Sequence, residues 1–530
     1  MSRILRFSAI SIVLTLVALA LLTSVALAAP GDVTADKVFG QGGSFTTQGC
    51  GLTASALCSP SGVAVDPAGN VYIADSANNR VLEYNTPLTS DFVADRVFGQ
   101  SGSFTSKVCN LGGITASSLC LPTDVAVDSA GDLFVVDFNN NRVLEYLTPT
   151  TSDTVADQVF GQANNFTTDT FIGFPFNTSA TPDTLANPIS VAIDSTGHLY
   201  IGDRGFHRVL EYDPPLTNTT ADRVFGQLGS FSTGGFNQGG ISANSLGDFN
   251  GIGVDSAGDL FVADSNNSRA LEYKTPLTTD TTADVVFGQY GSFTSSTPNL
   301  GGVSADSLES PTDIGADSAG NVYITDTGPE RTLIYDNPSA YGTTADVVFG
   351  QGGNFSAFGN NSGGVSASSQ ADPWAIAFDG TCDLYVVEYG NNRVSEYDQP
   401  PHACVIATGT PGPTSSPPAP TPTPSPTPVS TGCNPALPIP CTPTPVPTPT
   451  PTPTPTPPPL SPLPNTPTPT VGATTPPATG PVGGVSELLV SDGSSTSSPG
   501  RVAIVFVVIA MAVAVTVAAW YVGRRLRDIN

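Results

Sequence analysis

The sequence predicts an all-β fold: a six-bladed β-propeller closed by an N-terminal strand, followed by a disordered Pro/Thr-rich stalk and one transmembrane helix. A unit of about 62 residues recurs six times, and each copy holds short segments rich in β-branched and aromatic residues. Four antiparallel strands per unit, repeated around an axis, form the blades of a propeller. An aspartate marks the end of the first strand in every copy: Asp66, Asp128, Asp194, Asp255, Asp317 and Asp379.

The number of fourth strands predicts how the ring closes. The motif Val-Phe-Gly-Gln occurs six times, and its first copy, residues 38–41, precedes any complete unit. The sixth unit ends at Tyr397 without the motif. The N-terminal strand is therefore expected to complete the last blade, which leaves no open sheet edge. The propeller is expected to span residues 30–405.

The first unit illustrates the expected elements. A tight turn at residues 66–70 uses Gly69 for a positive φ angle. Nothing inside the repeats has a sustained 3.6-residue apolar period, so helices are not expected there. The four strands of this unit are expected at residues 63–65, 71–74, 81–84 and 96–98.

The repeat resembles the NHL repeat, a six-bladed propeller family. The resemblance rests on residues 60–66, 69–75 and 79–81 and their counterparts in all six units, and unit three carries the family's His-Arg step at His207. The long insertion between each fourth strand and the next blade departs from the family pattern. The family and propellers like it include protein- and RNA-binding modules, lyases and lactonases, so the resemblance implies a fold and no particular chemistry.

Both ends of the chain predict a surface location. Residues 1–28 have the pattern of a secretory signal peptide. The uncharged apolar run 502–522 is long enough to span a bilayer, and the arginines in 523–530 predict a cytoplasmic tail. We therefore expect a single-pass cell-membrane protein with an extracellular propeller. Its overall pattern looks bacterial.

A linker, residues 406–500, separates the propeller from the predicted membrane span. Residues 411–480 contain 28 prolines, largely in Thr-Pro repeats. Such a segment has too little apolar material for a core and should adopt extended polyproline II structure. We expect a stalk that holds the propeller away from the membrane.

Eight cysteines fit an extracellular protein. Two insertions each hold two cysteines, while the equivalent insertion before blade five has none, which favours pairing within an insertion. No Cys-x-x-Cys motif points to a metal site. The expected bridges are Cys50–Cys58, Cys109–Cys120, Cys382–Cys404 and Cys433–Cys441.

The charge of the propeller disfavours nucleic acid as a partner. Residues 30–405 contain 42 acidic and 12 basic side chains. Such a surface repels a phosphate backbone. Basic partners, cations and plain solubility all remain compatible with this charge.

Residues that differ between blades are the better candidates for binding, because one site requires asymmetry. Insertion three holds Phe171, Phe174 and Phe176, and contiguous apolar side chains on a loop mark interaction surfaces. Trp374, just before the first strand of blade six, is expected at the same mouth. The alternative is that the phenylalanines pack over neighbouring insertions. The repeated aspartates, arginines and tyrosines are expected to be structural, with an Asp–Arg pair or an Asx-type turn in each blade.

The leading expectation is a non-enzymatic binding module without a cofactor, which recognises an extracellular protein, peptide or glycan. The propeller has too few histidines for the zinc site of a propeller lyase. The alternative is a calcium-dependent extracellular lactonase or lyase-like hydrolase. Weak metal candidates for that alternative are Asp124, Asp313 and Asn250, because a channel-mouth calcium site needs oxygen ligands from different blades.

Overall fold

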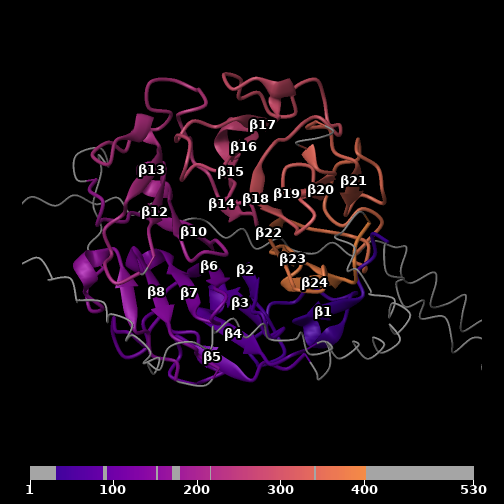
Figure 1. The fold of residues 1–530 in the computed structure, drawn as a ribbon. Coiled ribbons are helices and arrows are strands. Elements are labelled where there is room, and N and C mark those ends of the chain that lie inside the picture. The colour runs from indigo at the N-terminus through magenta and orange to yellow at the C-terminus, as the bar shows by residue number, and fades with distance from the viewer. Residues whose placement is uncertain are drawn as a thin grey trace, which may run out of the picture. The chain divides into compact units, whose positions relative to one another are not determined.

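Six four-stranded antiparallel sheets surround a common axis (Figure 1). The computed structural model describes residues 32–87, 92–150, 153–169, 180–214, 216–338 and 342–401. Each sheet is one blade, with its strands in sequence order from the axis outward. The first strands of neighbouring blades contact one another all the way around the ring, from β2 (Pro60–Val65) to β22 (Pro373–Phe378) and back to β2.

The strands follow the predicted four-per-unit order, with β1 (Lys37–Phe39) placed last in blade six. Blades one and two comprise β2, β3 (Val71–Asp75), β4 (Arg80–Tyr84) and β5 (Arg96–Phe98), then β6 (Pro122–Val127), β7 (Leu133–Asp137), β8 (Arg142–Tyr146) and β9 (Gln158–Phe160). Blades three and four comprise β10 (Pro188–Ile193), β11 (Leu199–Asp203), β12 (Arg208–Tyr212) and β13 (Arg223–Gly226), then β14 (Gly251–Val254), β15 (Leu260–Asp264), β16 (Arg269–Tyr273) and β17 (Val285–Gly288). Blades five and six comprise β18 (Pro311–Ala316), β19 (Val322–Asp326), β20 (Arg331–Tyr335) and β21 (Val347–Phe349), then β22, β23 (Leu384–Glu388), β24 (Arg393–Tyr397) and β1.

Among the residues that the structure describes, the helical elements are single 3-10 turns, which agrees with the lack of a helical period in the repeats. One set opens the insertions and the other joins the second and third strands of a blade. The turns are η1 (Gln41–Gly43), η2 (Ser76–Asn78), η3 (Phe138–Asn140), η4 (Gln162–Asn164), η6 (Arg204–Phe206), η7 (Gln227–Gly229), η8 (Ser265–Asn267) and η9 (Gln289–Gly291).

The N-terminal strand closes the ring as predicted. β1 pairs antiparallel with β24, and Lys37 lies opposite Glu396. The Lys37 ammonium is 3.3 Å from the Glu396 carboxylate and 3.0 Å from that of Asp398. Blade six therefore combines the two ends of the propeller, so unfolding of either end opens the ring.

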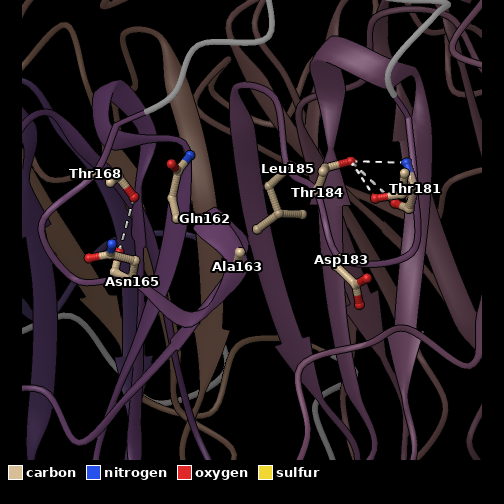
Figure 2. A pocket seen from close by; sticks show the side chains of 8 residues that line it. All are labelled: Gln162, Ala163, Asn165, Thr168, Thr181, Asp183, Thr184 and Leu185. Carbon is tan, nitrogen blue, oxygen red and sulfur yellow. Dashed lines mark hydrogen bonds between the residues drawn. The ribbon is translucent and has the colours of Figure 1, made fainter. Parts of the chain in front are cut away.

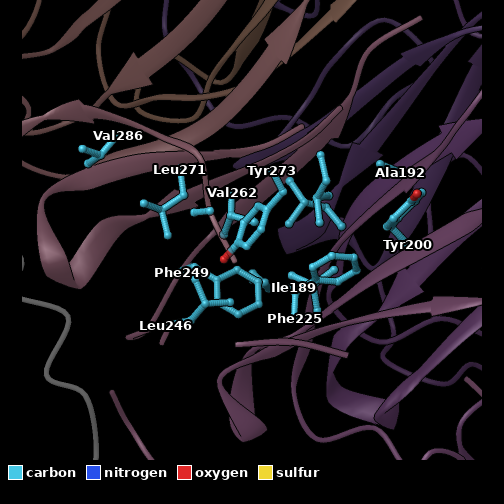
Figure 3. Packing of buried hydrophobic residues seen from close by; sticks show 14 residues of the cluster. Ile189, Ala192, Tyr200, Phe225, Leu246, Phe249, Val262, Leu271, Tyr273 and Val286 are labelled. Atoms are coloured by element: carbon cyan, nitrogen blue, oxygen red, sulfur yellow. The ribbon is translucent and has the colours of Figure 1, made fainter. Parts of the chain in front are cut away.

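The hydrophobic core is divided among the spaces between blades. Six clusters of buried side chains each combine residues of two adjacent blades, and Figure 3 shows the cluster between blades three and four. In each space a phenylalanine of one fourth strand meets a tyrosine of the next blade edge to face, with ring centroids 5.0–5.4 Å apart. The pairs are Phe98–Tyr146, Phe160–Tyr212, Phe225–Tyr273, Phe287–Tyr335, Phe349–Tyr397 and Phe39–Tyr84.

A buried ion pair fixes the same loop in every blade. In blade one, Arg80 Nε donates to Asp75 Oδ2 at 2.7 Å, and both side chains are fully buried. Arg80 also donates to the backbone carbonyl of Phe104, so it holds the next insertion in place. The predicted structural role of these pairs is confirmed in all six blades: Asp75–Arg80, Asp137–Arg142, Asp203–Arg208, Asp264–Arg269, Asp326–Arg331 and Glu388–Arg393.

Two of the expected disulfides are present, Cys50–Cys58 and Cys109–Cys120. Cys382 is disulfide-bonded, while its expected partner Cys404 lies outside the described residues. The expected bridge in the stalk lies outside them as well, as do residues 1–28, the linker 406–500 and the run 502–522. In the part of the chain that the structure describes, no helix is long and apolar enough to cross a membrane.

Candidate functional site

The three weak metal candidates, Asp124, Asp313 and Asn250, meet at the propeller axis. They line one narrow cavity together with Trp374, at the ends of the first strands where the insertions enter the blades. The cavity measures about 10 Å³ and receives side chains from all six blades. That volume accommodates one water molecule or one ion and no larger ligand.

Asp124 links its own blade to blade three. Its Oδ2 accepts hydrogen bonds from Ser190 Oγ at 2.6 Å and from the Val191 backbone N–H at 3.0 Å. Its Oδ1 accepts the Val125 backbone N–H at 2.8 Å. Burial raises the pKa of Asp124 to about 6, and these hydrogen bonds oppose the rise.

Asp313 makes the corresponding contact half a turn around the ring. Its Oδ2 accepts the Ile376 backbone N–H of blade six at 2.8 Å. Burial first, and then the negative charge of Asp124, raises the pKa of Asp313 well above its ordinary range. A buried carboxyl whose pKa is raised by a second carboxylate favours either its own protonation or a bound cation nearby.

The residues that face the axis follow the pattern small, acidic, small, and this pattern occurs twice around the ring. A Cβ added at Gly251 would lie 2.6 Å from the Asp313 Cα, and one added at Gly62 would lie 2.6 Å from the Asp124 Cα. Glycine in one blade therefore makes room for the aspartate of the next. The third residues of the six first-strand segments are Gly62, Asp124, Ser190, Gly251, Asp313 and Ala375.

Two oxygen atoms at the axis have no hydrogen-bond partner among the described residues. They are Thr123 Oγ1, on a side chain only 9% exposed, and Asn250 Oδ1. Carboxylate, hydroxyl and amide oxygens are the ligands that Ca²⁺ prefers. The donor set of the axial cavity therefore fits a small hard cation, and equally fits one ordered water.

Trp374 lies at the edge of this cavity and is half-buried. Its ring packs on that of Tyr389 with centroids 5.4 Å apart, and Tyr389 is 40% exposed. Phe171, Phe174 and Phe176 lie outside the described residues, so their predicted binding role stays a prediction.

A pocket of about 530 Å³ lies beside the two described ends of insertion three. Figure 2 shows Thr168 and Asn165 on one side, with Thr181, Thr184 and Leu185 on the other. Thr181 N–H donates to Thr184 Oγ1 at 3.0 Å, which shapes the second wall. Because residues 170–179 between these walls are not described, we assign no ligand to this pocket.

A second pocket, which sequence reasoning missed, lies on the insertion-bearing face and is called here the blade-three cleft. Its volume is about 480 Å³. Elements of blades two, three and four contribute to it, including η3 and η6. The cleft is lined by Phe138, Asn187, Arg204, Gly205, His207, Phe236 and Asp248.

The blade-three cleft combines an exposed ring with charged groups. Phe236 is 49% exposed and meets the His207 ring edge to face, with centroids 5.4 Å apart. His207 Nδ1 lies 3.1 Å from Asp248 Oδ1, and this hydrogen bond lowers the pKa of Asp248. Arg204 lowers it further. From the sequence, His207 is expected to be a surface loop residue, and the structure adds that it positions two other side chains of a cleft.

Comparison between repeats could have found this cleft. Arg204 occupies the slot that holds Ser76 in blade one. Phe236 stands nine residues after Gln227, the same spacing that separates Cys50 from the glutamine of insertion one. The available signal is a repeat position that holds different residue types in different blades. Whether such residues lie close together in space depends on the ring.

Two groups of carboxylate and histidine side chains lie close enough together to ligate an ion, but each already contains a cation from a fourth strand. Arg223 Nη1 is 3.0 Å from the Glu211 carboxylate, and Lys37 occupies the equivalent place in blade six. The positive charge of this cation therefore already offsets the negative charge of the carboxylates in each group. They are His198, Glu211 and Asp213, and Asp383, Glu396 and Asp398.

Comparisons with known proteins give one family match. A model of the NHL repeat matches residues 57–84 and 119–146. No curated protein matches the sequence significantly. Similar solved structures include a streptogramin B lyase, with 13% identity, a TM-score of 0.36, and coverage of 65% of this chain and 95% of that chain.

Two further solved structures show the same level of likeness. One is a catalytically inactive virginiamycin B lyase from Staphylococcus aureus with quinupristin, at 13% identity and a TM-score of 0.35, covering 64% of this chain and 84% of that chain. The other is a protein of unknown function from Bacteroides thetaiotaomicron, at 14% identity and a TM-score of 0.43, covering 70% of this chain and 74% of that chain. The chain thus carries segments that match the NHL repeat, at residues 57–84 and 119–146, and folds as a six-bladed β-propeller.

Proposed function

We propose that this protein is a membrane-anchored cell-surface interaction module, whose propeller binds an extracellular protein, peptide or glycan through its insertion-bearing face. The observation that supports the proposal is the blade-three cleft, about 480 Å³ in volume and bordered by the half-exposed ring of Phe236. Cavities of this size with a few convergent polar groups are typical ligand sites. The signal peptide, stalk and C-terminal span predicted from the sequence support an extracellular position of the propeller.

The architecture supports binding because the cleft rests on rigid elements. The buried ion pair of Asp203 and Arg208 lies directly beneath η6, and Arg208 also donates to the Phe231 carbonyl at 2.7 Å. Side chains that extend from such a scaffold are preorganised, which lowers the entropy lost on binding. Phe171, Phe174 and Phe176, which the sequence predicts to bind, remain part of the proposal.

The test is binding of the full chain, in detergent micelles, to arrays of extracellular glycans and peptides. We expect Phe236→Ser to lose the ligands that the parent protein binds, with a melting temperature within about 2 °C of the parent, because the ring is half-exposed. Phe358→Ser is the matched control, since Phe358 is 63% exposed in insertion six and lies outside the cleft. Ligands that bind the Phe236→Ser variant as well as the parent would contradict the proposal.

The second candidate function is a calcium-dependent extracellular hydrolase of the lactonase or lyase type. It is favoured by the convergence of Asp124, Asp313 and Asn250 on one cavity with unpaired oxygen atoms. The small volume of that cavity suits an ion that bridges blades better than a site that also holds substrate. A tightly bound divalent ion, and a melting temperature lowered by EDTA in the parent but not in Asp313→Asn, would support this candidate. Metal-free protein with no EDTA effect would remove it.

A further inference from the structure

Arg204 is the exception among the arginines that the structure describes. Eight of these nine arginines pair with a carboxylate in their own blade; six form the buried pairs, and Arg96 and Arg223 face Glu83 and Glu211. Among the described residues Arg204 forms no direct hydrogen bond or ion pair, although its positive charge lowers the pKa of Asp248 from a distance. Its guanidinium donors are therefore not used in a direct contact, and they can form two parallel hydrogen bonds to an external carboxylate.

The apolar part of the cleft has also been altered from the repeat pattern. In insertions one and two the corresponding positions form disulfides, for example Cys109–Cys120. In insertion four they are Phe236 and Gly247, and a Cβ at Gly247 would lie 3.3 Å from the Phe236 ring. Glycine therefore lets the ring lie over the backbone. In insertion four, the half-exposed ring of Phe236 thus replaces the disulfide.

The remaining groups suit hydroxyls rather than a peptide backbone. Asn187 borders the cleft, and the Asp248 side chain is 40% exposed and oriented by His207. The cleft elements are 3-10 turns and insertion segments, so no strand edge is available there for main-chain pairing with an extended peptide. An aromatic face with neighbouring amide and carboxylate groups matches a sugar ring, which presents C–H groups on one face and hydroxyls at its edge.

We propose that the blade-three cleft binds a carboxylated sugar ring, a uronic acid residue of an extracellular polysaccharide. This proposal rests on the proposed function and specifies the ligand class of that same site. Arg204 pairs with the ring carboxylate, Phe236 packs on the apolar face of the ring, and Asn187 and Asp248 hydrogen-bond to its hydroxyls. The carboxylate supplies the charge complementarity, because Arg204 is a cation of the cleft that forms no direct hydrogen bond or ion pair among the described residues.

Isothermal titration of the full chain in detergent micelles tests the proposal, with tetragalacturonic acid, neutral galactotetraose and a tetraglutamate peptide as probes. We expect tetragalacturonic acid to bind best, and Arg204→Gln to weaken this binding at least tenfold, as loss of a charge-assisted hydrogen bond does. Lys107→Gln is the matched control. It removes one positive charge from insertion two on the same face, outside the cleft, and should change the affinity less than twofold.

Three results would overturn the proposal: equal binding of galactotetraose, unchanged affinity in Arg204→Gln, or no binding of tetragalacturonic acid. Stronger binding of tetraglutamate that Arg204→Gln abolishes would show that the cleft takes acidic peptides; the sugar proposal is then wrong while the interaction-module function stands. The proposed interaction-module function has its own test. It is contradicted if the array ligands bind Phe236→Ser as well as they bind the parent protein. Melting curves of each variant verify that the fold is intact.

Discussion

A buried glutamate in blade two offers the sharpest test of the energetics. Glu145, in the middle of β8, is 8% exposed, and its carboxylate forms no hydrogen bond or ion pair within the described residues. Burial, strengthened by the negative charges of Asp132 and Asp128, raises the pKa of Glu145 to about 7. Burial raises the pKa of the corresponding Glu211 of blade three to about 7 as well, although Arg223 donates to it at 3.0 Å and opposes the rise.

The raised pKa means that Glu145 favours the folded state at acidic pH and that this advantage is lost as the pH rises through 7. From an unfolded pKa of about 4.5, a shift of roughly 2.5 units corresponds to about 3 kcal/mol at pH 8, and to less than about 1 kcal/mol at pH 5. Glu145→Gln removes the charge and keeps the shape. We therefore expect the free energy of unfolding of the variant, relative to the parent, to be about 2–3 kcal/mol larger at pH 8 than at pH 5, so that the variant gains stability at pH 8.

Urea unfolding, followed by far-UV circular dichroism at the two pH values, measures this difference. Glu211→Gln repeats the test at a second carboxyl whose pKa is also raised to about 7, so its free energy of unfolding relative to the parent should also be larger at pH 8 than at pH 5, offset by the loss of the ion pair with Arg223. If Glu145→Gln changes the free energy of unfolding equally at pH 5 and pH 8, the carboxyl is not desolvated as the structure indicates, and the reasoning is refuted.

Two further predictions concern the repeated and the axial positions. Arg142→Met should destabilise the propeller by about 3–5 kcal/mol in urea unfolding, because it leaves Asp137 buried without its partner; a loss below about 1 kcal/mol would contradict the structural role. Gly251→Ala should cost about 1–3 kcal/mol, because the added Cβ would lie 2.6 Å from the Asp313 Cα. Gly380→Ala is its control, since a Cβ at that exposed turn meets nothing within 4 Å, and similar losses in both variants would exclude a specific clash at the axis.

Much of the fold could be predicted because each blade is specified by local patterns. Alternating apolar residues and Gly-containing turns define strands over a few positions, and the count of fourth-strand motifs predicted that β1 completes blade six. Paired cysteines within an insertion predicted Cys50–Cys58, because the two residues are close in sequence. The pairing of Asp75 with Arg80 could also be predicted because the two residues are close in sequence, and the structure confirms it.

The candidate sites were harder to predict, because they combine residues from different blades. Asp124 and Asp313 could be suggested from their positions before the first strands, yet the rise in the pKa of Asp313 that Asp124 causes depends on the ring that brings them together. Arg204 and Phe236 were missed because each is an ordinary residue in its own segment. Their importance appears only when η6 and insertion four line one cleft.

The sequence by itself determined the repeat, the order of the strands and the closure of the ring, since these follow from short-range hydrogen-bond and apolar patterns that each blade repeats. Only the tertiary structure decided which polar groups lose water and which keep it. Glu145 belongs to an alternating strand pattern that carries no mark of burial, but the packing of blade two against its neighbours removes it from solvent. Arg204 belongs to an ordinary turn, but the ring places it in a cleft beside an exposed aromatic ring. Desolvation and convergence depend on contacts between distant parts of the chain, and no local pattern specifies them.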